Sequence, residues 1–187
     1  MKTGIILYGP PASGKDTITA ALSELAPQIV QFARLKIGEG RSQGYRMGTV
    51  EQLHQLEAAG DVIYRNDRYN SIYLVDRPGL DAVFDAGHTP IVHLGQIAGI
   101  CALVTGYPAA WLTVQLDCPR AVTEQRSTLR GDTDTLARLA AWDATAADLQ
   151  ANQDVEWALH LRTDEQSAAA SAQAIAKALG QAGYRDR

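Results

Sequence analysis

The sequence predicts an α/β fold in which helices flank a parallel β-sheet. Short apolar runs typical of buried parallel strands, such as Ile5-Ile6-Leu7-Tyr8, alternate with segments whose apolar residues recur at helical spacing. A glycine-rich turn joins the first of these strands to the first helix. Repeated β–α units favour a parallel sheet. The 187 residues are enough for one domain with a sizeable core, so residues 1–187 are predicted to form a single domain.

The order of the elements follows from apolar spacing and from glycine and proline boundaries. The first half is predicted to contain a strand at 5–8, a helix at 18–25, a strand at 29–35, a loop at 36–48, a helix at 50–59 and two strands within 61–75 around a polar turn at 65–70. The second half is predicted to contain a helix at about 78–86, a strand at 90–94, a helix starting at Gly95, a strand at 111–118, a helix opened by Pro119, a strand at 155–161 and an alanine-rich helix at about 166–179. The segment from 34 to 75 interrupts the β–α order and is predicted to be an insertion over a ligand.

The turn after the first strand carries a phosphate-binding pattern. Its sequence, GPPASGKDT, contains the Gly-x-x-x-x-Gly-Lys spacing between a strand and a helix, which is the context that such a loop requires. Two glycines let the backbone wrap a phosphate, while the lysine and the helix N-terminus supply positive charge. The fold is therefore predicted to be a three-layer P-loop NTPase sandwich. The residues predicted to bind the nucleotide are Gly9, Pro10, Pro11, Ala12, Ser13, Gly14, Lys15, Asp16 and Thr17.

Asp16 stands where a serine or threonine usually follows the lysine of this loop. A carboxylate is an acceptable hard-oxygen ligand for Mg²⁺, and Thr17 offers a competing hydroxyl one residue later. The alternative interpretation is an acidic residue that is simply favoured by the helix dipole. Asp16 and Thr17 are the predicted metal ligands, and which of the two binds directly is left open.

Composition excludes several other classes of protein. A formal net charge of −4 gives no electrostatic footprint for nucleic acid or for an anionic membrane. The two cysteines, Cys101 and Cys118, form no CxxC pair, so neither a disulfide framework nor a zinc site is predicted. No apolar run has the length of a signal sequence or a membrane span, so a cytoplasmic protein is expected. The oligomeric state is left open.

The order of P-loop, basic glycine loop, paired tyrosine-rich strands and arginine-rich segment resembles the guanylate kinase-like family over nearly the whole chain. Residues 60–75 lie over the nucleotide-monophosphate subdomain of that family, and TEQRSTLRGDTDTLARL, residues 123–139, is similar to its lid. The Gly-Lys-Asp variant of the P-loop looks like that of ribose 1,5-bisphosphate phosphokinase, a relative. The resemblance implies ATP-dependent phosphoryl transfer to a small phosphorylated acceptor, with an acceptor-binding subdomain at about 34–75 and a lid at about 123–148.

Catalytic roles follow from this resemblance. Phosphoryl transfer depends mostly on positioning and on neutralising the charge spread over the transferred group. The resemblance implies that Lys15 holds the β- and γ-phosphates and that Arg130 and Arg138 reach the phosphates in the closed state. Gly131 is predicted to break the helix between these two arginines. For Arg126, a solvated helix face is as good an interpretation as a functional role.

The acceptor side is interpreted in the same way. Arg34 corresponds to the first arginine of the family's acceptor-phosphate loop, whereas the second has no clean match and Lys36 and Arg41 are both substitutes for it. Tyr45 and Tyr73 fall where the family's two phosphate-contacting tyrosines lie. A tyrosine hydroxyl can donate a hydrogen bond to a phosphate. These residues are the predicted acceptor-phosphate site.

Three departures from the family affect the expected acceptor. Tyr64 stands at the position of the glutamate that reads guanine, and it is assigned to the acceptor site. Leu74-Val75 stands where the family has a serine or threonine, and His93 and Gly95 replace two acids. Neither Tyr64 nor Val75 can accept hydrogen bonds from guanine as a carboxylate does, although Asp67 could if the alignment slips.

The predicted function is therefore transfer of the γ-phosphoryl group of ATP, with Mg²⁺, to a nucleoside monophosphate other than GMP. Ribose 1,5-bisphosphate is the alternative acceptor. A guanylate kinase-like binding module that has lost catalysis is the alternative from another class of protein.

Overall fold

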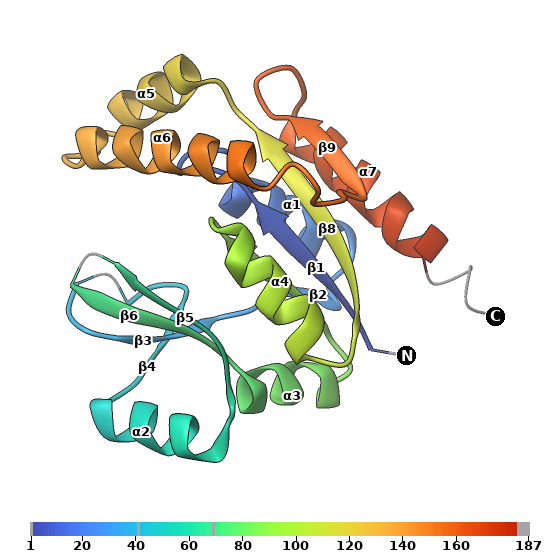
Figure 1. Ribbon diagram of the computed structural model, residues 1–187. Coiled ribbons are helices and arrows are strands. Elements are labelled where there is room, and N and C mark those ends of the chain that lie inside the picture. Colours follow the sequence, from blue (N-terminus) through green and yellow to red (C-terminus); the bar gives the residue numbers. More distant parts are fainter. Residues whose placement is uncertain (1, 41, 69, 183–187) are drawn as a thin grey trace.

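The computed structural model describes residues 2–40, 42–68 and 70–182, which form two β-sheets and the helices around them (Figure 1). The larger sheet has five strands in the order β2-β7-β1-β8-β9, and every neighbouring pair in it is parallel. The predicted parallel sheet is confirmed. Its strands are β1 (Thr3–Tyr8), β2 (Ile29–Gln31), β7 (Thr89–Leu94), β8 (Ala110–Asp117) and β9 (Leu159–Arg162).

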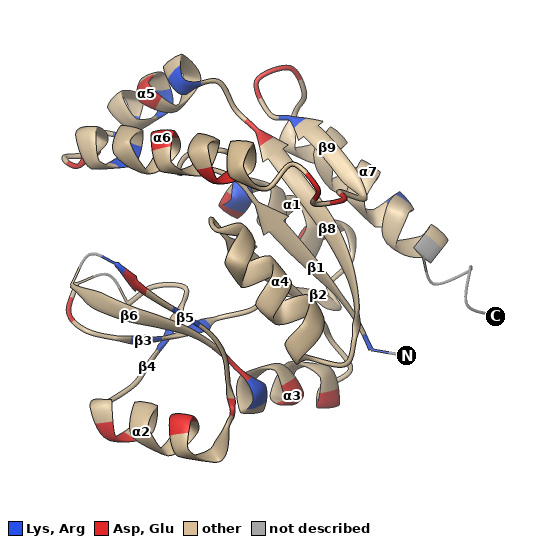
Figure 2. Ribbon diagram, viewed as in Figure 1, with Lys and Arg blue, Asp and Glu red and all other residues tan. Residues whose placement is uncertain are grey.

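Helices cover both faces of the larger sheet (Figure 1). One face packs against α1 (Lys15–Leu25) and α7 (Ala168–Ala182), and the other packs against α3 (Arg77–Asp85) and α4 (Ile97–Gly106). Figure 2 shows that α4 carries no charged residue, as suits a helix that packs against the sheet and against β5. The three-layer arrangement is confirmed.

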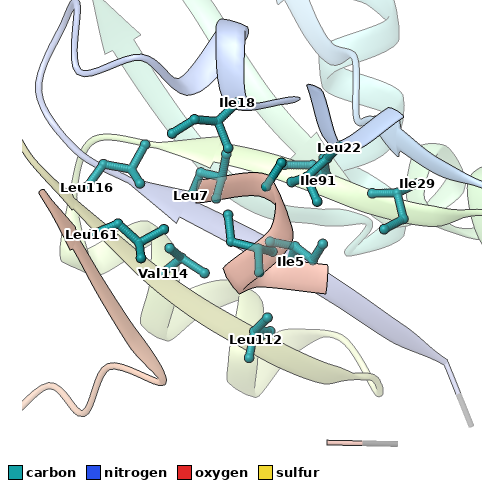
Figure 3. Close-up of a cluster of buried hydrophobic side chains, with 12 residues drawn as sticks. Ile5, Leu7, Ile18, Leu22, Ile29, Ile91, Leu112, Val114, Leu116 and Leu161 are labelled. Atoms are coloured by element: carbon teal, nitrogen blue, oxygen red, sulfur yellow. The ribbon is translucent and has the colours of Figure 1, made fainter. Parts of the chain in front are cut away.

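The apolar run in β1 supplies both halves of the core because successive side chains point to opposite faces of a strand. Ile5 and Leu7 pack with Leu22 of α1 and Ile175 of α7 in one apolar cluster, which Figure 3 shows in part. Ile6 and Tyr8, which point to the opposite face, belong to the cluster on the α3 and α4 side. The P-loop therefore follows the most buried strand of the sheet, since all five residues from Ile5 to Gly9 are buried.

The smaller sheet is built from the segment that interrupts the β–α order. Its strand order is β4-β3-β6-β5, with β3 parallel to β4 and antiparallel to β6. Its core contains Leu35, Ile37 and Leu74, against which Leu53 of a helix packs. The elements of this unit are β3 (Arg34–Ile37), β4 (Tyr45–Met47), α2 (Val50–Ala59), β5 (Val62–Arg68) and β6 (Ser71–Asp76).

Two predictions for this segment are wrong. The single strand predicted at 29–35 is divided between the two sheets, as β2 and β3. The apolar pattern runs on across the division because Phe32 is buried in the core between them and donates its backbone N–H to Ile91 at 2.8 Å. The predicted loop at 36–48 contains the end of β3 and all of β4.

The prediction of a polar turn at 65–70 is also wrong. β5 continues to Arg68 and β6 begins at Ser71. Asn66 and Arg68 are polar within a strand because one face of this hairpin borders a polar cavity rather than a core. The polar residues of this segment therefore line a cavity and do not form a turn.

The C-terminal elements differ from prediction mainly at their ends. The strand predicted from Val155 begins at Leu159, because Val155 and Trp157 pack against the core without joining the ladder. α5 (Arg120–Leu129) begins just after Pro119, and α6 (Thr135–Ala151) follows it. Gly131, in the left-handed region at φ 69°, separates the two helices as predicted. Among the described residues, no helix is long and apolar enough to cross a membrane.

Candidate active site

The P-loop connects β1 to α1 at the carboxyl edge of the larger sheet. Gly14 is the N-cap of α1 and adopts a φ of 91°, a conformation that side chains with a Cβ rarely adopt. Ala12 is also left-handed, at φ 58°. Lys15 begins the helix, so the helix N-terminus and its unpaired N–H groups face the loop. This arrangement is suited to binding an anion.

Lys15 lies folded over this loop. Its Nζ donates hydrogen bonds to the carbonyl oxygens of Gly9 at 2.7 Å and Pro10 at 2.8 Å, and to Ser13 Oγ at 3.2 Å. Burial lowers the pKa of Lys15 to about 8, with a smaller contribution from Arg34, while Asp16 opposes the shift. The ammonium therefore sits where an anionic ligand would stabilise its charge.

Two cavities open on either side of Lys15. The larger cavity, of about 1010 Å³, lies along the P-loop, α5, α6 and the segment after β9. The smaller cavity, of about 510 Å³, lies between the P-loop and the smaller sheet. The residues that line both are Pro11, Lys15, Arg34, Tyr45, His93 and Arg138. The two spaces therefore meet at a group of basic side chains.

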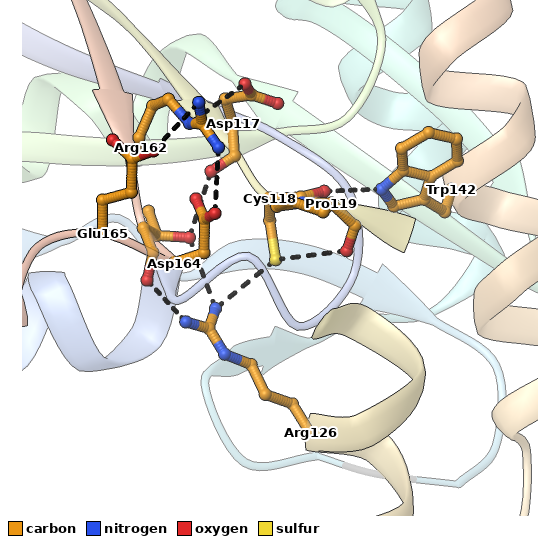
Figure 4. Close-up of polar contacts among 9 residues, drawn as sticks. Asp117, Cys118, Pro119, Arg126, Trp142, Arg162, Asp164 and Glu165 are labelled. Carbon is orange, nitrogen blue, oxygen red and sulfur yellow. Dashed lines mark hydrogen bonds and ion pairs between the residues drawn. The ribbon is translucent and has the colours of Figure 1, made fainter. Parts of the chain in front are cut away.

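Arg126 lines the larger cavity, and Figure 4 shows its side chain among its polar contacts. Its Nη1 donates to the carbonyl oxygen of Ala12 at 3.1 Å and to Thr163 Oγ1 at 3.3 Å, and its Nη2 donates to the carbonyl oxygen of Thr163 at 2.5 Å. Nη1 also lies 3.5 Å from Cys118 Sγ. These contacts exclude the solvated-face interpretation of Arg126.

Arg130 and Arg138 both line the larger cavity, and Arg138 also lines the smaller one. Each guanidinium pairs with Asp132, at 3.3 Å for Arg130 and 3.2 Å for Arg138, and Arg138 also pairs with Asp134 at 2.7 Å. The structure thus brings the two arginines together with the P-loop. The prediction that they act on phosphates stays a prediction.

Four of the predicted acceptor residues, Arg34, Lys36, Tyr45 and Tyr73, form one cluster in the smaller cavity. Arg34 lies over the rings of Tyr45 and Tyr73, at 5.8 and 5.3 Å from their centroids, and Lys36 lies 5.9 Å from each. The two rings are 5.3 Å apart. Lys36 is only 3% exposed, and its Nζ donates to the carbonyl oxygen of Glu39 at 2.5 Å. Two cations and two phenols thus converge beside the P-loop.

Not every residue assigned to the acceptor site lines this cavity. The ring of Tyr64 packs closely on Gly99 of α4, and its hydroxyl donates to Gln96. Burial raises the pKa of Tyr64 accordingly. Val75, its partner across the hairpin, is buried in the core, so neither residue lines the smaller cavity. Arg41 lies outside the described residues.

Asp67, the alternative guanine reader, also lies away from the cavity lining. Its carboxylate accepts two hydrogen bonds from the Arg65 guanidinium, each at 2.8 Å, on the exposed face of β5. Glu39 is the carboxylate of this segment that does line the smaller cavity.

Sequence reasoning missed three residues of the smaller sheet that line the smaller cavity, Asn66, Arg68 and Ser71. In the hairpin Asn66 pairs with Tyr73, and Arg68 pairs with Ser71. Alternation along the two strands, counted from Tyr73, would have placed these three residues on one face of the hairpin. They were missed because residues 65–70 were predicted to form a turn.

His93, noted in the sequence only as a departure from the family, lines both cavities. Its Nε2 lies 2.8 Å from Thr19 Oγ1 and its Nδ1 lies 3.5 Å from Asp16 Oδ1. Burial lowers the pKa of His93 well below its usual value, and Lys15 and Arg34 lower it further, so the ring is neutral at neutral pH. A proton on Nδ1 directed at Asp16, with Nε2 accepting from Thr19, satisfies both contacts. His93 is a polar residue near the end of an apolar strand, and this pattern in the sequence could have indicated that it belongs to the site.

The residues around Asp16 fit a magnesium ion that is bound mainly by nucleotide. The Asp16 side chain is 70% exposed and, like Thr17, lines the larger cavity beside Lys15. Mg²⁺ usually takes one or two protein oxygens and completes its shell with phosphates and water. No group of three or more His, Cys, Asp or Glu residues that could hold a metal occurs in the described part of the chain. Asp16 and Thr17 therefore suit a shared nucleotide–metal site.

Comparison with solved structures finds the same fold in two kinases. A guanylate kinase from Anaplasma phagocytophilum matches with a TM-score of 0.64 and 16% identity, over 96% of this chain and 85% of that one. A sugar kinase from Janibacter sp. HTCC2649 matches with a TM-score of 0.55 and 20% identity, over 96% of this chain and 94% of that one. The fold is P-loop kinase-like. No protein-family model matches the sequence, and comparison with curated proteins gives no match.

Proposed function

We propose that this protein is an ATP-dependent kinase that transfers the γ-phosphoryl group of ATP to a small phosphorylated acceptor. The observation that carries the proposal is the meeting of two cavities at Lys15. Phosphoryl transfer needs two substrates held in line, with positive charge around the transferred group. Arg34 and Arg138 also line both cavities and add that charge.

The larger cavity is the proposed ATP site. The P-loop N–H groups and the N-terminus of α1 bind the phosphates, and Lys15 leaves its carbonyl partners to contact the β- and γ-phosphates. The far end of the cavity, lined by Arg126, Thr163 and Gln166, takes the nucleoside. In the reaction the bond from the γ-phosphorus to its bridging oxygen breaks, an acceptor phosphate oxygen forms the new bond, and ADP leaves.

Three groups of this chain act on the charge of the transferred group. Lys15 neutralises the bridging region, while Arg130 and Arg138 approach from the α5–α6 side when the site closes. Asp16 and Thr17 would hold Mg²⁺, which supplies further charge neutralisation on the phosphates when it is bound. His93 Nδ1 lies 3.5 Å from Asp16 Oδ1, so the ring limits the positions that this carboxylate can take.

The smaller cavity is the proposed acceptor site, in which Arg34, Lys36, Tyr45 and Tyr73 bind the acceptor phosphate. The leading acceptor class is a nucleoside monophosphate other than GMP. The reason is the loss of the family's guanine-reading carboxylate, whose position is taken by Tyr64. Guanine donors left buried without an acceptor cost about 1–3 kcal/mol each.

A second acceptor, ribose 1,5-bisphosphate, is favoured by the remaining wall of the smaller cavity. Asn66, Arg68 and Ser71 present an amide, a guanidinium and a hydroxyl there. Such groups suit sugar hydroxyls and a second phosphate better than the flat face of a base, which is usually bound against apolar or aromatic surfaces. Tyr64 packs on Gly99 outside this cavity and cannot stack on a base there. The two rings that do line the cavity, Tyr45 and Tyr73, lie against the cations Arg34 and Lys36.

An acceptor panel tests both parts of the proposal. ADP formation and the phosphorylated product are measured with ATP, Mg²⁺ and, separately, AMP, CMP, UMP, GMP, ribose 1,5-bisphosphate or no acceptor. We expect transfer to at least one acceptor, and a higher kcat/KM for another compound than for GMP. If GMP has by far the highest kcat/KM, the argument against guanine is wrong, and Glu39 is the first residue to test as the acceptor of the hydrogen bonds from guanine.

The same panel separates the rival functions. ADP formation that is independent of any acceptor identifies a hydrolase. ATP binding without turnover for any acceptor of the panel favours the binding module that has lost catalysis.

A further inference from the structure

A single carboxylate oxygen lies between the two arginines at the connection of α5 and α6. Asp132 Oδ2 is 3.3 Å from Arg130 Nη2 and 3.2 Å from Arg138 Nε. The same oxygen accepts a hydrogen bond from Ser127 Oγ at 3.1 Å. Figure 2 shows acidic residues at this connection and basic residues on both helices. Asp132 is thus the common partner of both predicted catalytic arginines.

The backbone and side chain of Asp132 are held independently of the arginines. Its N–H donates to the carbonyl oxygen of Ser127 at 3.1 Å, and Thr135 Oγ1 donates to its carbonyl oxygen at 3.2 Å. Ser127 is fully buried, and its hydroxyl lies 2.9 Å from that of Thr135. The left-handed Gly131 makes the turn that brings Asp132 back over α5. Asp132 is therefore fixed before any ligand arrives.

Two guanidinium groups aimed at one ligand repel each other unless an anion lies between them. A guanidinium has five N–H donors, so an arginine that pairs with a carboxylate can also donate to a phosphate. We propose that Asp132 is a positioning residue that sets Arg130 and Arg138 side by side on the larger cavity, so that both reach the transferred phosphoryl group together. This inference rests on the proposed function, and Asp132 acts through the two arginines.

The opposite role would be a restraint, in which Asp132 competes with phosphate for the arginines. The two roles predict opposite signs. A positioning carboxylate raises kcat, so its removal lowers kcat; a restraint lowers kcat, so its removal raises it. The fixed geometry of Asp132 favours positioning, because a preorganised group costs no reorganisation during the reaction.

The chain offers a matched control for this test. Asp143 also lies on the α5–α6 pair and also binds an arginine of α5, Arg120, at 2.9 Å. That pair is exposed, and neither residue lines the larger or the smaller cavity. Asp132→Asn is expected to lower kcat by about 10- to 100-fold while changing the Kd for ATP much less. Asp143→Asn is expected to stay within about twofold of wild type.

Two further variants link the effect to the arginines. Ser127→Ala removes the hydrogen bond that orients Asp132 and should give a smaller loss of kcat in the same direction. In an Arg130→Ala/Arg138→Ala background, Asp132→Asn should add less than about twofold, because residues that act as a unit are not additive. A rise in kcat for Asp132→Asn, an equal loss in Asp143→Asn, or full additivity would each overturn the inference.

A readout without turnover keeps this inference separate from the proposed function. In protein with ¹⁵N-labelled arginine, the ¹⁵N chemical shift of Arg138 Nε is measured by NMR. The Nε–H donates to Asp134 Oδ1 at 2.7 Å, and Asp132 Oδ2 lies 3.2 Å from the same nitrogen. We expect this shift to change in Asp132→Asn, because a negative charge next to the guanidinium is removed, and to stay unchanged in Asp143→Asn. An Arg138 signal that is the same in Asp132→Asn and wild type would mean that Asp134 alone holds Arg138 and would overturn the inference. A wild-type enzyme without phosphoryl transfer would overturn the proposed function instead.

Discussion

Arg126 Nη1 lies 3.1 Å from the carbonyl oxygen of Ala12, across 114 residues of sequence. Ala12 has a left-handed backbone, and its carbonyl oxygen accepts this bond from a residue of α5. The same guanidinium donates to Thr163 Oγ1 and to the carbonyl oxygen of Thr163. One arginine therefore ties the P-loop to the segment after β9, and so links two walls of the larger cavity.

Replacing Arg126 by alanine should therefore weaken both the fold and nucleotide binding. Two carbonyl groups lose their donor, and we expect the free energy of unfolding to fall by about 1–3 kcal/mol. Arg126→Lys should rescue only part of this loss, because an ammonium cannot reproduce the planar fork of donors. Urea unfolding and calorimetry with ATP measure the two effects.

Arg120→Ala is the matched control for Arg126, since Arg120 belongs to the same helix but pairs on the surface with Asp143. Its free energy of unfolding should stay within about 0.5 kcal/mol of wild type. Equal behaviour of the two variants would show that the contacts of Arg126 contribute little.

Lys15→Ala should abolish phosphoryl transfer, with kcat/KM lowered by at least about 100-fold, while the fold remains intact. The side chain bonds only to its own loop in the described structure, so its loss removes charge from the phosphate site rather than packing from the core. Coupled ADP detection measures the rate, and circular dichroism checks the fold. Lys177→Ala, at an exposed position of α7, serves as control. A folded Lys15→Ala enzyme with undiminished transfer would contradict the enzyme assignment.

Asp16→Asn should raise the Mg²⁺ concentration required for half-maximal activity, because a neutral amide is a weaker ligand for this cation. Asp16→Ser should preserve more of the metal response, since it restores a hydroxyl oxygen at that position. Initial rates across a Mg²⁺ titration at saturating ATP measure the effect, with Asp143→Asn as control. If the Mg²⁺ titration is unchanged in Asp16→Asn, the carboxylate does not bind the metal, and its role is only a favourable interaction with the N-terminus of α1.

Asp81 makes the stability of the fold sensitive to acid. Its carboxylate accepts hydrogen bonds from the Tyr107 hydroxyl at 2.6 Å and from Lys2 Nζ at 3.3 Å, and these bonds lower the pKa of Asp81 below its usual value of 3.8. A depressed carboxyl pKa stabilises the folded state above the usual value, and the stabilisation is lost as the pH falls through the lowered pKa.

The stability difference between wild type and Asp81→Asn should therefore be constant near neutral pH and shrink below pH 3.8. Urea unfolding at a series of pH values measures it. Asp85→Asn, at the exposed end of the same helix, serves as the control for the substitution itself. A difference that does not depend on pH would show that the carboxylate acts through packing alone.

The central sheet and the P-loop were predictable because their signals are local. The apolar run of β1 and the glycine and lysine spacing of the loop each concern residues that are neighbours in the chain, and periodicity states which faces are buried. Gly131 was predictable for the same reason, as a break between two helical segments. The alternation of strands and helices then required parallel pairing.

The walls of the two cavities depended on contacts that no local pattern contains. Phe32 is apolar like a strand residue, yet it marks the passage from one sheet to the other. Tyr64 aligns with a base-reading residue, but the absence of a side chain at Gly99 lets its ring pack on α4 instead. Asn66 looked like part of a turn because it is polar, whereas it faces the smaller cavity from within a strand.

The sequence by itself thus determined the α/β class, the phosphate loop and the positions of its lysine and acid, since these follow from spacing along one strand, one turn and one helix. Only the tertiary structure decided that two cavities meet at Lys15, that Arg126 reaches Ala12 and that Asp132 joins two arginines. Each of these relationships brings together groups from different elements. Their distances are set by how the helices and the second sheet pack on the core. The hydrophobic effect has no preferred direction, so the spacing of apolar residues along the chain does not specify these distances.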